Sequence, residues 1–487
     1  MGSVAVIQKR PCRINGSFDD GVTSHLLSCP PPSPDSPGSP GIKVLVEKGP
    51  GREGPSLSFT ADQHLKPVSY GALVRGNANF RNLWLGQIVS LLGDWFNLIA
   101  SAALIAQLSE TGFAIGTLFV VRMLAPFVVS PVAGVLADRY NRKHILIVTD
   151  ITRAITVLGF LLITRPEDLW LLYTLTAIQL GISGFFFPTR NAILPDVVSD
   201  RELGAANALS STTWSVMLAL GAALGGLVSG IWGIHPAFVI DALTFILSAF
   251  FIFRVNYQEV AHLEDSEKSI RRGLKQYLDG LRYLHRHVDV LMISLHKAAS
   301  ALFVSGFQVV QVIVTASIFT IGEAGGISLG LMFAVAGVGT GFGPILARHF
   351  TGDRAPALRR VIILGYGLAS LGLAISAPLS SFPIVLVGTF MRGAGGGIIW
   401  VFSTQLLMQL VPNQVRGRVF STEFAMFTLT SAIGAALAGA VLDSALGISG
   451  TIGWMAALTL VPGILWWFWM GGNRPIGESP SHSDPNP

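Results

Sequence analysis

The chain has 487 residues, of which 51% are hydrophobic and 13% are charged, and its mean hydropathy is +0.58. Soluble proteins carry about a quarter of charged residues, so this composition excludes a soluble protein of this size. The formal net charge of +5 suits a surface that faces anionic lipid headgroups. The sequence therefore predicts a polytopic protein of the lipid bilayer, and we expect no nucleic-acid partner.

Residues 1–75 are rich in Gly, Pro and Ser, a composition that does not bury enough apolar surface to fold. We predict a disordered cytoplasmic tail here, which is either regulatory or dispensable, and a second disordered tail over residues 473–487. Both cysteines, Cys12 and Cys29, lie in the first tail. We therefore expect neither a disulfide nor a Cys-based metal site in the membrane part.

A helix needs about 20 apolar residues to cross a hydrocarbon core of about 30 Å, and such runs follow one another from Leu83 onward. We expect an all-α fold with twelve transmembrane helices, arranged as two six-helix bundles over 76–255 and 289–472. The predicted spans are 82–107, 113–136, 145–164, 168–190, 204–230, 236–255, 289–314, 326–349, 359–378, 382–406, 419–441 and 451–470.

The two halves repeat each other. Gly221-Ala-Ala-Leu-Gly-Gly226 matches Gly434-Ala-Ala-Leu-Ala-Gly439 at an offset of 213 residues (434 minus 221). Two pseudo-symmetric bundles are the architecture of carriers that work by alternating access, because a site between the halves opens to each side in turn.

Lys and Arg concentrate in alternate loops, which places those loops and both termini on the cytoplasmic side. We expect the protein in the cell membrane, that is, a plasma or inner membrane. The linker 256–288 contains a helical stripe of apolar residues over 268–287, with arginines around it. We interpret this stripe as an amphipathic helix that lies on the inner leaflet, and a partner-binding helix is the alternative.

One acid and three fixed cations stand in the short segment between the second and third spans. Gly134, Asp138, Arg139, Arg142 and Lys143 together resemble the signature loop of the major facilitator superfamily. Asn141 replaces the usual glycine of that loop, and Asn also tolerates the left-handed backbone of a tight turn. The resemblance implies twelve helices, no cofactor and a gating loop that latches the two halves in one state.

Other segments indicate which branch of this superfamily the chain resembles. Leu83-Trp-Leu-Gly-Gln87, Gly93-Asp94-Trp95 and Val411-Pro412 through Val419 resemble the drug:proton antiporter branch that contains macrolide-efflux proteins and the enterobactin exporter. The resemblance implies export coupled to proton entry and does not fix a substrate. We expect a monomeric secondary transporter that exports an amphipathic drug, macrolide or siderophore-like compound. A lysophospholipid or metabolite carrier of the same fold and a non-transporting receptor or scaffold remain alternatives.

Two ionisable residues fall near the middle of the first two spans. Asp94 lies about 18 Å into the first span, at 1.5 Å per residue, and Arg122 lies at a similar depth in the second. Charges at this depth are costly and are functional by default. We expect Asp94 to exchange the coupling proton with Arg122 as its charged partner, and a static ion pair is the alternative.

Further charged residues are candidates for a network at the inner ends of the helices. Asp150 and Arg153, three residues apart, can meet on one helix face, and Glu423 is a candidate neighbour of the gating loop. Arg392 lies in a Gly-rich stretch of the tenth span and is a candidate cavity residue. For Lys297 and Asp241 we expect structural pairing.

The sequence indicates no enzyme. It has no HExxH pair, no Walker loop and no cysteine nucleophile within the spans, so we expect neither a catalytic residue nor a bound metal.

Overall fold

A computed structural model describes residues 5–7, 10–12, 68–109, 111–257, 270–352 and 354–472. The chain divides into two units, Met1–Lys66 and Pro67–Pro487. In the first unit, strand β1 (Ala5–Ile7) pairs antiparallel with β2 (Arg10–Cys12) inside the segment that the sequence predicts to be disordered. The rest of that predicted tail before residue 68, and the predicted tail 473–487, lie outside the described residues.

The second unit is built of helices. The first half contains α1 (Tyr70–Gly76), α2 (Ala78–Leu108), α3 (Gly112–Arg139), α4 (Arg142–Leu158), α5 (Leu169–Val197), α6 (Asp200–Ile231) and α7 (Ile234–Phe253). After the linker helix α8 (Ile270–Arg286), the second half contains α9 (Val288–Ser317), α10 (Gly326–Thr351), α11 (Ala355–Ser376), α12 (Phe382–Leu410), α13 (Asn413–Leu442) and α14 (Gly447–Gly472). Short 3₁₀ turns, η1 (Gly159–Leu162), η2 (Pro166–Asp168) and η3 (Glu323–Gly325), link some of them.

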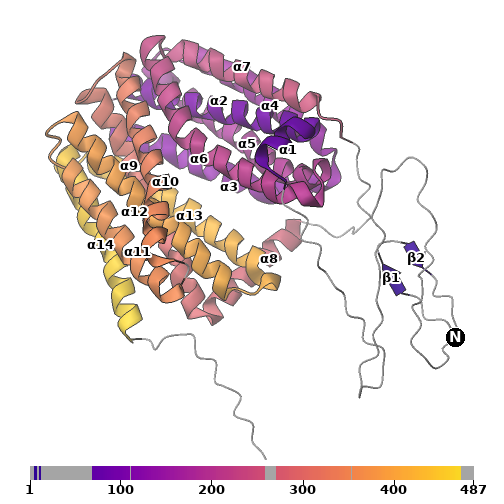
Figure 1. The fold of residues 1–487 in the computed structure, drawn as a ribbon. Helices are drawn as coiled ribbons and strands as arrows, with labels where there is room; N and C mark the ends of the chain where they lie inside the picture. The colour runs from indigo at the N-terminus through magenta and orange to yellow at the C-terminus, as the bar shows by residue number, and fades with distance from the viewer. Residues whose placement is uncertain are drawn as a thin grey trace, which may run out of the picture. The chain divides into compact units, whose positions relative to one another are not determined.

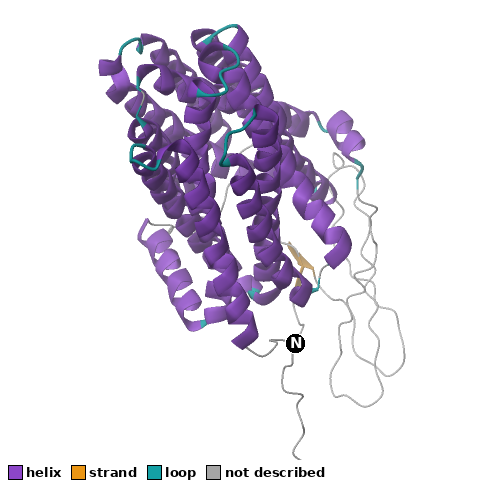
Figure 2. Ribbon diagram, turned by 90° about the vertical axis from the view of Figure 1, so that its left-hand side faces the viewer, coloured by secondary structure: helices purple, strands orange, loops and turns teal. Residues whose placement is uncertain are grey.

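Twelve helices in the described part of the chain are long and apolar enough to cross a membrane, so the predicted number of spans is confirmed. The helices of the first half, drawn from indigo to magenta in Figure 1, group apart from those of the second half, drawn from orange to yellow. In Figure 2 the long helices run side by side. Many large apolar side chains, such as Trp170, Ile345 and Phe350, are exposed, as expected of helices whose outer faces contact lipid.

Local signals explain where several helices begin. Asn77 caps α2 by accepting a hydrogen bond from the backbone N–H of Phe80 at 2.9 Å, and Ser199 with Glu202 forms a capping box at α6. Asn141 caps α4 by accepting from the N–H of His144 at 3.2 Å. Its φ is −56°, so the predicted left-handed backbone is wrong. Asn stands there because it can cap a helix.

Glycines bring the two halves together in two places, where α6 packs against α10 and α3 against α13. A Cβ added at Gly226 of α6 would lie 2.6 Å from the Cα of Gly330 in α10, and one at Gly112 of α3 would lie 2.6 Å from the carbonyl oxygen of Gly439 in α13. Small residues thus let the backbones touch, which is how helices pack without a hydrophobic driving force.

These contacts lie at one end of the bundles. We call the end where α3 finishes and α4 starts, at residues 139–142, the charged-loop end, and the other the opposite end. Gly112 is the first residue of α3 and Gly439 is near the last of α13, while Gly226 is near the last of α6 and Gly330 near the first of α10. The close glycine contacts between the halves are therefore at the opposite end.

The predicted linker helix is present as α8, and one side of it packs against the second half. A Cβ at Gly280 would lie 2.7 Å from the carbonyl oxygen of Arg418 in α13, and Leu284 is buried among apolar residues of the second half. Leu278 remains exposed. The glycine allows close approach to α13, so one side of α8 is covered by helices and another is left open.

We expect Gly330→Ala to destabilise the protein, because the new methyl group overlaps the backbone of α6 and overpacking costs about 1–3 kcal/mol. Gly341→Ala on the same helix is the matched control, since a Cβ there meets nothing within 4 Å and alanine favours a helix by about 1 kcal/mol. Thermal unfolding in detergent measures both. Equal melting temperatures for the two variants would show that the halves do not depend on this contact.

Candidate functional site

A buried ion cluster joins three helices of the first half. Asp94 of α2 forms an ion pair with Arg153 of α4. A second nitrogen of Arg153 donates to Asp150 at 3.5 Å and to the hydroxyl of Ser90 at 3.1 Å. The second carboxylate oxygen of Asp150 accepts from Ser248 of α7 at 2.6 Å. The predicted pair of Asp150 and Arg153 is thus formed, as part of a larger network.

The members of the cluster differ in access to solvent. The side chains of Arg153 and Asp150 are 1% and 0% exposed, whereas that of Asp94 is 29% exposed. Arg153 also stacks on the ring of Phe245, with its guanidinium carbon 3.9 Å from the ring centroid. Asp94 is therefore the member of the Asp94–Arg153–Asp150 network that reaches water or a ligand.

The predicted direct pair of Asp94 with Arg122 is wrong for this conformation. Arg122 donates instead to the side-chain oxygen of Asn97, at 3.4 Å, one turn along α2 from Asp94. Depth along a helix was correctly placed by counting residues, but the count does not say which neighbouring helix a side chain faces. Asp94 faces α4, where Arg153 is already held by Asp150.

The gating segment is partly described. Gly134 lies within α3, and the side chains of Asp138 and Arg139 lie outside the described residues. Arg142 donates to the carboxylate of Asp196 at 2.7 Å and to the carbonyl of Ala192 at 3.0 Å, both on α5. Lys143 lies over the ring of Phe253, 5.2 Å from its centroid. These contacts fix the start of α4 to α5 and α7.

Glu423 forms an ion pair within the second half. Its predicted position beside the gating loop stays a prediction, because the side chains of Asp138 and Arg139 lie outside the described residues. Its carboxylate accepts from Lys297 of α9 at 3.0 Å, with side chains 2% and 6% exposed. Lys297 also lies over the ring of Trp400, 4.5 Å from its centroid. Structural pairing was expected for Lys297, but its partner is 126 residues away and no sequence signal connects the two.

Asp241 of α7 does not form the structural pair expected of it. It is 0% exposed, and neither carboxylate oxygen has a hydrogen-bond partner of ordinary geometry among the residues that the structure describes, with only the side chain of Asn97 close by as a weak donor. Sequence reasoning had no means of separating Asp241 from Lys297, because both are single charges in apolar spans.

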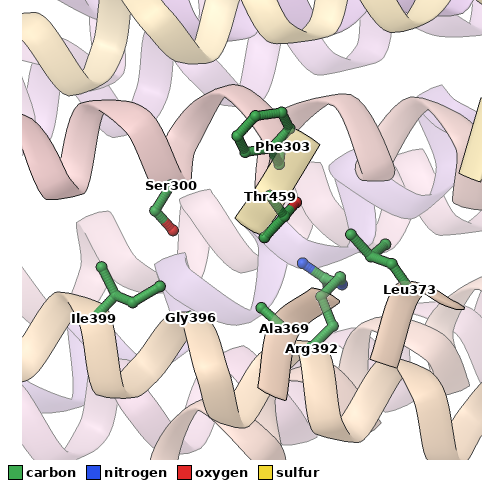
Figure 3. A pocket seen from close by; sticks show the side chains of 8 residues that line it. All are labelled: Ser300, Phe303, Ala369, Leu373, Arg392, Gly396, Ile399 and Thr459. Atoms are coloured by element: carbon green, nitrogen blue, oxygen red, sulfur yellow. The ribbon is translucent and has the colours of Figure 1, made fainter. Parts of the chain in front are cut away.

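Arg392 of α12 lies on the wall of a pocket inside the second bundle. The other lining residues are Ser300, Phe303, Ala369, Leu373, Gly396, Ile399 and Thr459. Figure 3 shows the guanidinium directed from its helix toward Thr459. Arg392 is 7% exposed and its guanidinium carbon is 4.7 Å from the ring centroid of Phe307.

No carboxylate among the described residues pairs with Arg392, and its Nε has no hydrogen-bond partner there. The described residues also contain no group of three His, Cys, Asp or Glu side chains suited to a metal ion.

The sequence model of the Major Facilitator Superfamily matches residues 83–357 and 299–486, so the chain belongs to this family of membrane transporters. It is 29% identical over 385 residues to an uncharacterized MFS-type transporter, YfiS, of Bacillus subtilis (strain 168), covering 77% of this chain and 89% of the relative. It is 26% identical over 408 residues to the multidrug resistance protein MdtG of Salmonella paratyphi C (strain RKS4594), covering 80% and 95%.

The fold agrees with this family. The crystal structure of the nucleoside transporter NupG superposes with a TM-score of 0.65 at 13% identity, over 81% of this chain and 100% of NupG. At this identity the likeness concerns the fold alone. The chain is thus a multi-pass membrane protein with the major facilitator fold, and transporters of this family carry small molecules.

We expect Arg153→Gln to lower the melting temperature strongly, because it leaves Asp94 and Asp150 without their shared cation. Removing one partner of a buried pair costs about 3–5 kcal/mol. Arg282→Gln is the matched control: Arg282 is also bonded to an acid three residues before it, Asp279 at 3.0 Å, but its side chain is 63% exposed and such pairs contribute about 0–1 kcal/mol. Similar melting shifts in both variants would contradict the role of burial.

Proposed function

We propose that the chain is a monomeric secondary active exporter, in the plasma or inner membrane, with both termini in the cytoplasm. It moves an amphipathic organic compound, drug, macrolide or siderophore-like, out of the cell as a proton enters, by alternating access. The observation that carries the proposal is the buried cluster in which the accessible carboxylate of Asp94 is held by Arg153. The similarity to a multidrug resistance protein supports the class of cargo.

Protonation of Asp94 changes this cluster in a defined way. The ionised carboxylate attracts Arg153, and the neutral carboxyl does not, so Arg153 then remains with Asp150 and the hydroxyl of Ser90. Inside a low-dielectric bundle this difference is larger than in water. A proton arriving at Asp94 therefore loosens the connection between α2 and α4, and its departure restores it.

Trp95, which follows Asp94 in α2, contacts the other bundle. The ring of Trp95 meets the ring of Phe333 of α10 edge to face, with centroids 5.9 Å apart. Trp95 also packs against Gly221 of α6, where a Cβ would lie 2.6 Å from its ring. In our proposal, Asp94 senses the proton on one side of α2, and Trp95 transmits the resulting movement to the interface between the halves.

The described conformation suits uptake of cargo from the cytoplasm. The cations of the charged-loop end favour a cytoplasmic location, and the glycine contacts close the halves at the opposite end. In the proposed cycle this is the state in which the outer side is shut. We further propose that Asp138 and Arg139 latch the halves at the charged-loop end when the protein opens outward, with Arg142 and Asp196 holding the base of the loop in place.

We expect Asp94→Asn to abolish cargo accumulation driven by a pH gradient while leaving exchange of cargo down its own gradient. The amide keeps the shape of the carboxyl but does not exchange a proton. An electroneutral exchanger gains about tenfold accumulation for each 1.4 kcal/mol stored in the gradient, so the loss is measurable. The experiment records proton flux in proteoliposomes on adding lipophilic drugs and siderophores.

Asp289→Asn is the matched control, because Asp289 lies in the first turn of α9, far along the chain from the cluster. Uphill export with an unchanged pH dependence in Asp94→Asn would contradict the assignment of Asp94. Absence of cargo-evoked proton flux in the unchanged protein would overturn proton antiport, and transport of lysophospholipid or metabolite in the same liposomes would identify the alternative carrier. Silence toward all of them would favour a receptor or scaffold.

We also propose that Arg392 selects cargo by its oxygen atoms. A buried guanidinium without a carboxylate partner offers donors to a carbonyl or carboxylate group. The cavity beside it has a volume of about 10 Å³ in the described conformation, which is room for about one water molecule, so in this proposal cargo reaches Arg392 only after the surrounding helices have separated. This assigns cargo recognition to the second bundle and proton exchange to the first.

We expect Arg392→Gln to raise the KM for cargo that carries a carboxylate by about tenfold or more, since hydrogen bonds to charged groups contribute about 1.5–3 kcal/mol. The KM for lipophilic cations should stay the same or fall. Parallel transport assays with an anionic and a cationic cargo measure the ratio. An equal rise for both would mean that Arg392 supports the fold of the pocket and does not select cargo.

A further inference from the structure

Asp241 has an unusual environment for a carboxyl group. It is fully buried in α7, and among the described residues neither of its side-chain oxygens has a hydrogen-bond partner of ordinary geometry, with the side chain of Asn97 close by as a weak donor. The nearby hydroxyl of Thr244 is not available as a donor to the carboxylate, because it donates to the backbone carbonyl of Asp241 at 2.7 Å. A carboxylate without donors or a paired cation is costly to bury, whereas the neutral acid is far less so.

The carboxyl of Asp241 is pressed against α2 beside Asp94. A Cβ added at Gly93 would overlap both the carboxyl of Asp241 and the hydroxyl of Thr244. Gly93 is therefore the residue that lets α7 bring this acid to the helix that carries the accessible acid. Asp94 and Asp241 flank the same short stretch of α2.

The charged groups around Asp241 do not balance. The helices α2 and α4 that pack against α7 contribute Asp94, Asp150 and Arg153, and α3 contributes Arg122. Arg153 is engaged with Asp94 and Asp150, and Arg122 bonds to Asn97. Three carboxyl groups thus face two guanidinium groups, and one proton makes the cluster neutral.

We propose that Asp241 holds that proton in the conformation described, and that it is the internal store for the proton that Asp94 exchanges with water. The role of Asp241 as a proton store rests on the proposed antiport, but its protonation does not. Asp94, at 29% exposed, is the entrance, and Asp241, at 0%, is closed to solvent. The network therefore contains two acids with different access that share one proton.

The proton transfer balances without any other reactant. The O–H bond of Asp241 breaks and an O–H bond forms on Asp94, so the net charge of the cluster does not change. The neutral Asp94 releases Arg153, and the new carboxylate of Asp241 then attracts the two guanidinium groups beside it. Release of the proton from Asp94 to water and uptake of another from the opposite side complete the cycle.

Infrared spectroscopy of the purified full chain tests the protonation directly. We expect the unchanged protein at neutral pH to show the carbonyl stretch of a protonated carboxyl, shifted in D2O, and Asp241→Asn to lose it. Asp289→Asn is the control and should retain the band. Asp94→Asn leaves two carboxyl groups facing two guanidinium groups, so the band should weaken in that variant. Absence of the band in the unchanged protein, or an undiminished band in Asp241→Asn, would overturn the proposal.

Proteoliposome transport tests the coupling. Asp241→Asn keeps the size and neutral charge of the protonated acid, so we expect normal folding and cargo exchange, with pH-driven accumulation reduced at least about tenfold. Gly93→Ala, which displaces the Asp241 carboxyl, should weaken coupling in the same direction. Full coupling in Asp241→Asn would overturn the role as proton store. If the unchanged protein shows the infrared band but no proton flux, antiport fails while the protonation of Asp241 stands.

Discussion

Hydrocarbon does not solvate charge, so each ionised side chain within the spans must be neutralised by another group of the protein. Arg153 meets this requirement for Asp94 and Asp150 at once and thereby fixes how α2 and α4 face each other. Ser248 extends the same network to α7 through Asp150. The accessible acid of this cluster, Asp94, and its buried acid, Asp150, both depend on this single shared cation.

The contacts within and between the bundles differ in kind. Within each bundle, buried ion pairs such as Lys297 with Glu423 connect helices and are costly to break. Between the bundles, the close contacts include glycine backbones, such as those of Gly226 and Gly330. The Asp443 carboxylate also accepts hydrogen bonds from the backbone N–H groups of Gly112 and Phe113, at 2.7 and 2.9 Å. Separation of the halves at this end breaks none of the buried ion pairs described within each bundle, which suits rocking around a central site.

The sequence predicted features that depend on position along the chain, and it failed for contacts that depend on how the helices pack. Hydropathy gave the twelve spans, the 134–143 segment gave the family, and residue counting put Asp94 near the middle of its helix. The direction of a side chain around its helix is not contained in such counts, so Arg122 was chosen over Arg153 as the partner of Asp94. Glu423 and Lys297 are adjacent only because α13 and α9 pack together. Asn141 caps the start of α4 through its side chain, and it does not adopt the left-handed backbone that its residue type suggested.

The duplication shows how the two halves have diverged at equivalent positions. Phe307 stands 213 residues after Asp94 and Tyr366 stands 213 after Arg153, so an ion pair in the first bundle corresponds to two aromatic rings in the second. Arg392 packs on Phe307 at 4.7 Å, where no carboxylate is present among the described residues to neutralise it. One bundle therefore carries excess acid and the other an uncompensated cation. In the proposed antiport, a proton neutralises the first and an oxygen-bearing cargo pairs with the second, so the same duplicated scaffold would supply both sides of the exchange.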